Sequence, residues 1–159
     1  MLNDSGTLYI ISAPSGGGKT SLVRALLDTL SGIEVSVSYT TRQPRLGDRE
    51  GVDYFFVSEE AFFNKRQQGD FLETALVFQY YYGTSISWVK KKLAQGIDII
   101  LEIDWQGARA VREAMSGTVS IFIVPPSIEE LSKRLRGRGQ DDTAVINHRM
   151  EKACAECEH

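Results

Sequence analysis

The segment that decides the fold reads LYIISAPSGGGKT at residues 8–20, an apolar run followed by a glycine-rich turn. A helical pattern from Lys19 to Leu30 follows directly. Strand, glycine loop and helix in this order are typical of a phosphate-binding loop, in which glycines let successive backbone N–H groups converge on an anion. The N-terminus of the following helix adds partial positive charge. The segment therefore predicts a site for a nucleoside triphosphate.

Two side chains at the end of this loop have the chemistry that nucleotide phosphates require. Lys19 is long enough to reach the β and γ phosphates, and the Thr20 hydroxyl is an oxygen ligand for Mg²⁺. Ala13 departs from the consensus, which has its first glycine there. The simplest alternative is an ordinary glycine turn before a helix. A dinucleotide-binding turn is disfavoured, because it does not need the Lys-Thr pair and no acidic residue ends a second strand at the expected distance.

Length and composition predict one compact domain. The chain has 159 residues, of which 42% are hydrophobic and 25% are charged. This length is enough for one hydrophobic core and too short for two full domains. No apolar stretch is long enough to span a bilayer, and residues 1–6 lack the features of a signal peptide. We therefore expect a cytoplasmic protein with no membrane partner. The net charge of −3 argues against general nucleic-acid binding.

Apolar runs alternate with helical patterns along most of the chain. The runs lie at residues 8–12, 34–38, 97–103 and 120–124, and the helical patterns at 19–30, 85–95, 106–115 and 127–136. Fully apolar runs suit a parallel sheet covered by helices on both faces. The alternation therefore predicts an α/β fold with right-handed crossovers. Ser127 and Glu130 have the spacing of a capping box at the start of the last of these helices.

The stretch from Tyr39 to Tyr82 breaks the alternation. It carries short aromatic runs around a short helix at residues 58–68, and we interpret it as a small mixed insertion that forms a second binding lobe. The polar sequence GRGQDD at 137–142 predicts a hinge before a final helix at 143–159. The expected division is a core at 1–33 and 90–133, a binding lobe at 34–89, a lid at 134–150 and a helix continuing to 159.

Arginines narrow the chemistry, since the loop alone is compatible with an ATPase, GTPase, helicase, transporter or kinase. Arg42 and Arg45 follow a strand three residues apart, and guanidinium groups match phosphate oxygens in geometry. They imply a second anion near the first. A further group surrounds the hinge, where closure would bring it over a transferring phosphoryl group: Arg134, Arg136, Arg138 and Arg149.

Cys154 and Cys157 have a C-x-x-C spacing, with His148 and His159 nearby, so a metal or redox site is an alternative. There is no second cysteine pair, and the segment is predicted as helix without the strand or glycine of a redox turn. Helical neighbours in a reducing cytosol explain the spacing.

Several segments spread along the chain resemble those of guanylate kinases. They read SYTTRQPR at 38–45, GVDYFF at 51–56, FLE at 71–73, YYGTS at 81–85, LEIDWQG at 101–107 and PPSIEELSKRLRGRG at 125–139. The resemblance implies a P-loop kinase fold, with a parallel core sheet flanked by helices, a small mixed α/β insertion that binds GMP, and a helical lid. It also implies transfer of the γ-phosphoryl group of ATP to GMP or dGMP with Mg²⁺ as cofactor.

The residues make independent sense of this reaction. Guanine offers two neighbouring donors and one acceptor, which a carboxylate such as Glu73 and a hydroxyl such as Ser38 match, whereas adenine does not. By the resemblance, the GMP-binding set is Ser38, Arg42, Arg45, Tyr54, Glu73, Tyr82, Thr84 and Asp104. The ATP-binding set is Ser15, Gly16, Gly17, Gly18, Lys19, Thr20, Ser21 and Arg134. The predicted catalytic residues are Lys19, Arg45, Arg138 and Arg149, with Thr20 as the metal ligand.

Two other functions stay open: a non-catalytic module of the same fold that binds phosphorylated partners, and a kinase of a different phosphorylated acceptor such as a ribose bisphosphate. The intact Lys19-Thr20 pair favours the enzyme, and Glu73 with Ser38 favours guanine. The family's sheet normally has a further strand and a closing helix, so we expect a C-terminally truncated member in which the strand at 120–124 is an uncovered edge. The sequence leaves the oligomeric state open.

Overall fold

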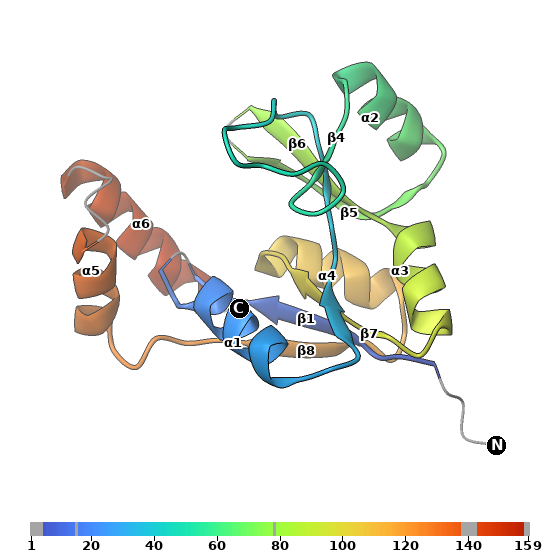
Figure 1. Ribbon diagram of the computed structural model, residues 1–159. Coiled ribbons are helices and arrows are strands. Elements are labelled where there is room, and N and C mark those ends of the chain that lie inside the picture. Colours follow the sequence, from blue (N-terminus) through green and yellow to red (C-terminus); the bar gives the residue numbers. More distant parts are fainter. Residues whose placement is uncertain (1–4, 15, 78, 138–142, 158–159) are drawn as a thin grey trace.

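The computed structural model describes residues 5–14, 16–77, 79–137 and 143–157. Among these residues, two four-stranded sheets lie side by side, one forming the centre of the molecule and the other a smaller lobe above it (Figure 1). A pair of helices, α5 and α6, projects from the end of the central sheet where the glycine loop lies (Figure 1). In the described chain, no helix is long and apolar enough to cross a bilayer.

The central sheet is parallel throughout, in the strand order β2-β7-β1-β8. Its strands are β1 (Leu8–Ser12), β2 (Ile33–Val35), β7 (Asp98–Glu102) and β8 (Val119–Phe122). The helices around it confirm the predicted α/β class with a parallel core sheet. β1 lies between β7 and β8, so the glycine loop that follows it emerges near the middle of the sheet. In parallel sheets, ligands bind at the carboxyl ends of the strands, where this loop lies.

Strand β1 is packed on both faces of the central sheet. On one face, Leu8 and Ile10 of β1 pack with Val89 of helix α3 (Ile86–Ala94) and Val111 of helix α4 (Trp105–Ala114). On the other, Ile11 packs with Val23 of helix α1 (Lys19–Thr29). Neighbouring residues of β1 thus face opposite helices, which explains why Ile10 and Ile11 are both apolar.

β8 is an edge strand in the described sheet. Val119 is 42% exposed, Ile121 43% and Phe122 39%, and β8 pairs only with β1 among the described strands. The edge predicted at residues 120–124 is therefore open in the described chain.

The helices begin at side chains that cap them. Ser58, Ser85 and Asp104 accept hydrogen bonds from the backbone N–H groups of Ala61, Trp88 and Gly107 at the starts of α2 (Glu59–Gln67), α3 and α4. Ser127 accepts from the N–H of Glu130 at 3.1 Å at the start of α5 (Ile128–Gly137). These caps satisfy donors that lack partners within the helix. The final helix, α6, covers Thr143–Glu156.

The smaller sheet has the strand order β4-β3-β6-β5 and contains antiparallel pairs. Its strands are β3 (Tyr39–Thr40), β4 (Phe55–Phe56), β5 (Phe71–Val77) and β6 (Tyr80–Ser85). Helix α2 packs on it through Phe62, which is fully buried and stacks on Phe71 with ring centroids 4.7 Å apart. Leu72 of β5 belongs to the core cluster of the central sheet and thereby ties the two sheets together.

The strand predicted at residues 34–38 ends well before its expected limit. The apolar run at 34–38 suggested a strand to Ser38, but β2 ends at Val35. Beyond it the chain crosses between the sheets, because the Ser36 N–H still donates to Ile100 while the Ser38 carbonyl already accepts from Phe55 in the smaller sheet. Residues 36–38 therefore form hydrogen bonds with both sheets, which the local hydrophobic pattern does not predict.

Candidate active site

The loop between β1 and α1 has the backbone geometry that the glycines predict. Gly16 has φ +86° and Gly18 φ +97°, angles that side chains disfavour, and the Gly17 N–H donates to the Pro14 carbonyl at 2.8 Å. Gly18 is the N-cap of α1 and has no side chain to satisfy the first N–H groups of the helix. These donors are suited to bind an external anion. Ser15 lies outside the described residues.

Lys19 stands within a group of acidic side chains at the first turn of α1. Burial lowers the pKa of its ammonium group from the ordinary value, while the carboxylates of Glu102, Asp104 and Glu156 act in the opposite direction. The Thr20 hydroxyl donates to Oε2 of Glu102 at 3.4 Å, although Thr20, like Ser21, is exposed. Lysine, hydroxyl and carboxylate thus meet at the carboxyl edge of the sheet.

Helix α5 adds a cation over the loop. A Cβ placed on Gly18 would lie 3.5 Å from Nη1 of Arg134, so this guanidinium faces the glycine segment. Its Nε donates to Oε1 of Glu130 at 2.9 Å, one turn earlier in the helix. The predicted role of Arg134 beside the phosphate loop therefore has a matching position.

The smaller sheet contributes a buried carboxylate. Glu73 on β5 is 8% exposed, and its Oε1 accepts a hydrogen bond from the Thr84 hydroxyl on β6 at 2.8 Å. Burial raises the pKa of Glu73, the Thr84 hydrogen bond opposes that rise, and the nearby Asp104 carboxylate adds to it. A Cβ on Gly107 would lie 3.3 Å from Oε2 of Glu73, so Glu73 reaches the first turn of α4.

Asp104 connects the two halves of the site. Its Oδ1 accepts from the Gly107 N–H at 2.9 Å and caps α4. Its charge also acts on both Lys19 and Glu73, which puts Asp104 between the phosphate loop and the carboxylate of the smaller lobe. The capping contact leaves the second carboxylate oxygen for another partner.

Arg42 lies at the centre of the group predicted to bind the second anion. It is 8% exposed, and its Nη2 lies 2.9 Å from Oδ2 of Asp48. Its guanidinium also lies 5.2 Å from the ring centre of Tyr54, and Tyr54 in turn contacts Tyr82 edge-on. Burial raises the pKa of Tyr54, so its hydroxyl stays protonated and able to donate. Three of the residues predicted to bind the GMP phosphate are thus together.

The remaining predicted residues lie in varied surroundings. The Arg45 side chain is exposed, while its backbone N–H donates to Asp48 at 2.8 Å. Ser38 is half-buried next to the smaller sheet, and Arg149 is half-buried on α6. Arg138 lies outside the described residues.

Three residues join the site that sequence reasoning did not include. Glu102 is level with Ile11 in the parallel register, and its place at the end of an apolar run is a signal that could have been used. The pKa of Asp48 is lowered first by a hydrogen bond from the Arg45 N–H and further by Arg42. This arrangement lies in a loop that has no local sequence pattern. Glu156 belongs to the site only because α6 packs with its end near Lys19.

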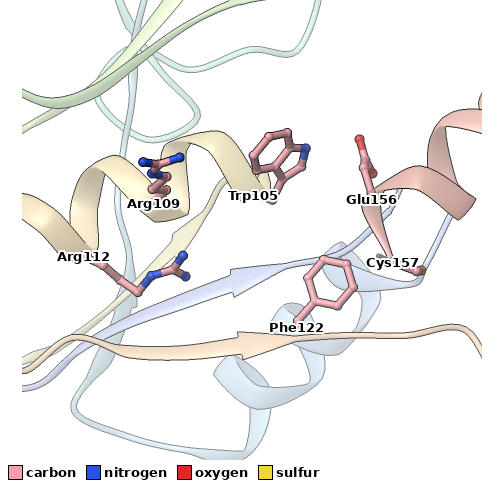
Figure 2. A pocket seen from close by; sticks show the side chains of 6 residues that line it. All are labelled: Trp105, Arg109, Arg112, Phe122, Glu156 and Cys157. Carbon is pink, nitrogen blue, oxygen red and sulfur yellow. The ribbon is translucent and has the colours of Figure 1, made fainter. Parts of the chain in front are cut away.

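A pocket of about 350 Å³ lies to one side of these groups, between α4, β8 and the end of α6. Figure 2 shows Trp105, Phe122 and Glu156 around it, with Arg109 and Arg112 along α4 and Cys157 at the end of α6. None of the predicted binding residues lines it. Cys154 and Cys157 are free and exposed, and burial raises the pKa of Cys157.

A glycine loop at the carboxyl ends of a parallel sheet, on the side of a second lobe with a buried carboxylate and an arginine, is the arrangement of a P-loop protein. The family model described as guanylate kinase matches residues 5–159. The guanylate kinase of Saccharophagus degradans is 57% identical over 158 residues, which cover 99% of this chain and 77% of that protein. That of Hahella chejuensis is 56% identical over 154 residues, covering 97% and 74%.

Solved structures agree with this. The crystal structure of guanylate kinase from Anaplasma phagocytophilum has a TM-score of 0.72 and 36% sequence identity, and the match covers 98% of this chain and 72% of that chain. The chain spans about three quarters of the length of these relatives. It belongs to the guanylate kinase family.

Proposed function

We propose that this chain transfers the γ-phosphoryl group of ATP to GMP or dGMP, giving ADP and GDP or dGDP. Family membership supports a GMP kinase. The observation that carries the proposal in the structure is the buried Glu73, bonded to Thr84 and close to Asp104, on the side of the molecule that holds Lys19. A buried carboxylate that faces another carboxylate is unfavourable unless a ligand supplies donors.

Guanine supplies those donors. Its N1–H and N2 amino groups are adjacent and match the two oxygens of one carboxylate, while Ser38 and Thr84 add hydroxyl groups. We assign base recognition to Glu73, Ser38, Thr84 and Asp104. Adenine lacks the N1–H donor and would leave the carboxylate unpaired, and a site of this kind discriminates by roughly 10⁴ to 10⁵.

The phosphate of the acceptor is assigned to Arg42, Arg45, Tyr54 and Tyr82. Arg42 is held by Asp48 and by two aromatic rings, so its orientation is largely set before GMP binds. Pre-orientation lowers the entropy that binding must remove. Arg45 is exposed, and we infer that its side chain turns to the phosphate when GMP is present.

The donor half consists of the glycine segment, Lys19 and Arg134. Backbone N–H groups and the helix N-terminus hold the phosphates of ATP, and Lys19 neutralises the charge that develops on the transferring group. The Lys19 ammonium is kept near three carboxylates, and we infer that the ATP phosphates replace them as its partner. Ser15, Ser21, Arg138 and Arg149 keep the roles that the sequence predicts.

Mg²⁺ fits the donor set at Thr20. The Thr20 hydroxyl and the Glu102 carboxylate are oxygen ligands within 3.4 Å of each other, and Mg²⁺ prefers oxygen and takes few protein ligands beside substrate phosphates. We infer that these two residues hold the ion directly or through its waters. When bound, it would neutralise charge on the β and γ phosphates.

Identification of the products tests the proposal. Incubation of the chain with ATP, Mg²⁺ and GMP should give ADP and GDP in equal amounts by ion-exchange chromatography, and Lys19→Ala is the control. If no GDP forms, or if a ribose phosphate accepts the phosphoryl group as fast as GMP, the proposal is wrong.

The cytoplasm remains the expected compartment, an expectation that rests on the sequence.

A further inference from the structure

Two leucines of α5 lie close to Gly16, the first glycine of the phosphate loop. A Cβ placed on Gly16 would lie 2.9 Å from Cδ1 of Leu131 and 2.9 Å from Cδ2 of Leu135. The glycine is therefore required twice, by its positive φ and by the lack of space for a side chain. Leu131 and Leu135 are 2% and 1% exposed, so their positions are firmly set.

The same leucines form the inner side of a small core between α5 and α6. They pack with Ile146, Ala153 and Met150 of α6 in a cluster separate from the two clusters of the central sheet. α6 runs back toward the N-terminal end of α1 (Figure 1). The leucine side chains thus lie between α6 and the loop.

The same helix also places a cation near the loop. Arg134 lies between the two leucines in the sequence, and its guanidinium faces Gly18 while the leucines face Gly16. α5 therefore offers an apolar support and a cation to neighbouring points of one loop. A core residue without this role would pack only against other side chains, whereas these leucines pack against α6 and also lie close to the backbone of the loop.

We propose that Leu131 and Leu135 are positioning residues for the phosphate donor, because they hold the Gly16–Gly18 segment in the shape that binds ATP. The inference rests on the proposed function of the loop as the ATP site. A loop of three glycines has high conformational freedom, and ordering it would otherwise draw on the binding energy of ATP. Removing the support should therefore weaken ATP binding and leave GMP binding unaffected.

The experiment compares Leu135→Ala with Ile146→Ala. Ile146 belongs to the same cluster, but the three atoms nearest to a Cβ on Gly16 all come from Leu131 and Leu135, so Ile146 is a match for loss of core packing. Leu135→Ala should raise the Kd for MgATP, measured by titration calorimetry, and the KM for ATP by about ten- to a hundredfold. Ile146→Ala should lower the melting temperature comparably and leave both values near those of the parent chain. The KM for GMP should be unchanged in both.

The milder Leu135→Val and Leu135→Met serve if Leu135→Ala fails to fold. Met restores most of the volume and should rescue ATP binding, whereas Val should show a smaller rise in Kd. ATP affinity equal to that of the parent chain in Leu135→Ala or, if that variant fails to fold, in Leu135→Val would overturn the inference, and so would equal weakening in Ile146→Ala. A parent chain that binds ATP but makes no GDP would refute the proposed function while leaving this comparison intact.

Discussion

Replacement of Glu73 by glutamine keeps the shape of a buried side chain and changes only its charge and one acceptor. Glu73 is 8% exposed, and its Oε1 accepts from the Thr84 hydroxyl at 2.8 Å. The amide oxygen of glutamine can keep that hydrogen bond, and the amide nitrogen then presents N–H groups where guanine also presents N–H groups. The substitution therefore removes the recognition of the base with little effect on packing.

The magnitude follows from the bond that is lost. A hydrogen bond to a charged group contributes about 1.5–3 kcal/mol, so kcat/KM for GMP should fall roughly ten- to 150-fold. Because burial raises the pKa of Glu73, the folded state disfavours the charged form at neutral pH, and the neutral glutamine should not lower the melting temperature. The KM for ATP should stay the same.

Coupled measurement of ADP release at saturating ATP and varied GMP checks this prediction. Glu113→Gln is the matched control, because Glu113 lies on α4 with its side chain 67% exposed and pairs with Arg109. Its kinetics should equal those of the parent chain. An unchanged kcat/KM for GMP in Glu73→Gln would refute the assignment of Glu73 to the guanine base, and a large loss of stability would refute the argument from burial.

Lys19→Ala should lower kcat by about 10²–10³, because the cation at the transferring group is lost, while calorimetry should find GMP binding unaltered. The raised pKa of Glu73 predicts that the KM for GMP increases as pH falls through that pKa, since guanine needs the ionised form; the rise should begin at a higher pH than for an ordinary glutamate, and the profile of Glu73→Gln should lack it. Asp48→Asn weakens the hold on Arg42 and should raise the KM for GMP but not for ATP, which steady-state kinetics with each nucleotide varied will determine. Chelation of Mg²⁺ with EDTA should stop GDP formation and leave the affinity for GMP alone intact.

The central sheet was predictable because its signals are local. The apolar runs at residues 8–12, 97–103 and 120–124 form strands, and Ser127 caps the helix that follows it, as the sequence predicts. The strand expected at 34–38 failed at its end, since Ser38 pairs with a strand that follows it by many residues. Non-local pairing of this kind overrides hydrophobic pattern.

The site divides in the same way. Gly16, Gly18 and Lys19 lie within four residues of one another, so their sequence pattern predicts a phosphate loop. Glu102 and Glu156 come near Lys19 from β7 and α6, which no local pattern indicates. The resemblance to guanylate kinases predicted that Glu73 and Arg42 belong to the site. Their surroundings come only from tertiary packing, since Glu73 is buried near Asp104 and Arg42 is paired with Asp48. Burial and charge pairing are properties of the folded chain.

Acceptor selectivity tests the central claim most directly. The measurement is the ratio of kcat/KM for GMP to that for AMP, at saturating ATP and Mg²⁺, from the rate of ADP release. A site in which Glu73 pairs with the guanine edge predicts a ratio above about 10³. A ratio near one, or ADP release that does not depend on GMP, would contradict it.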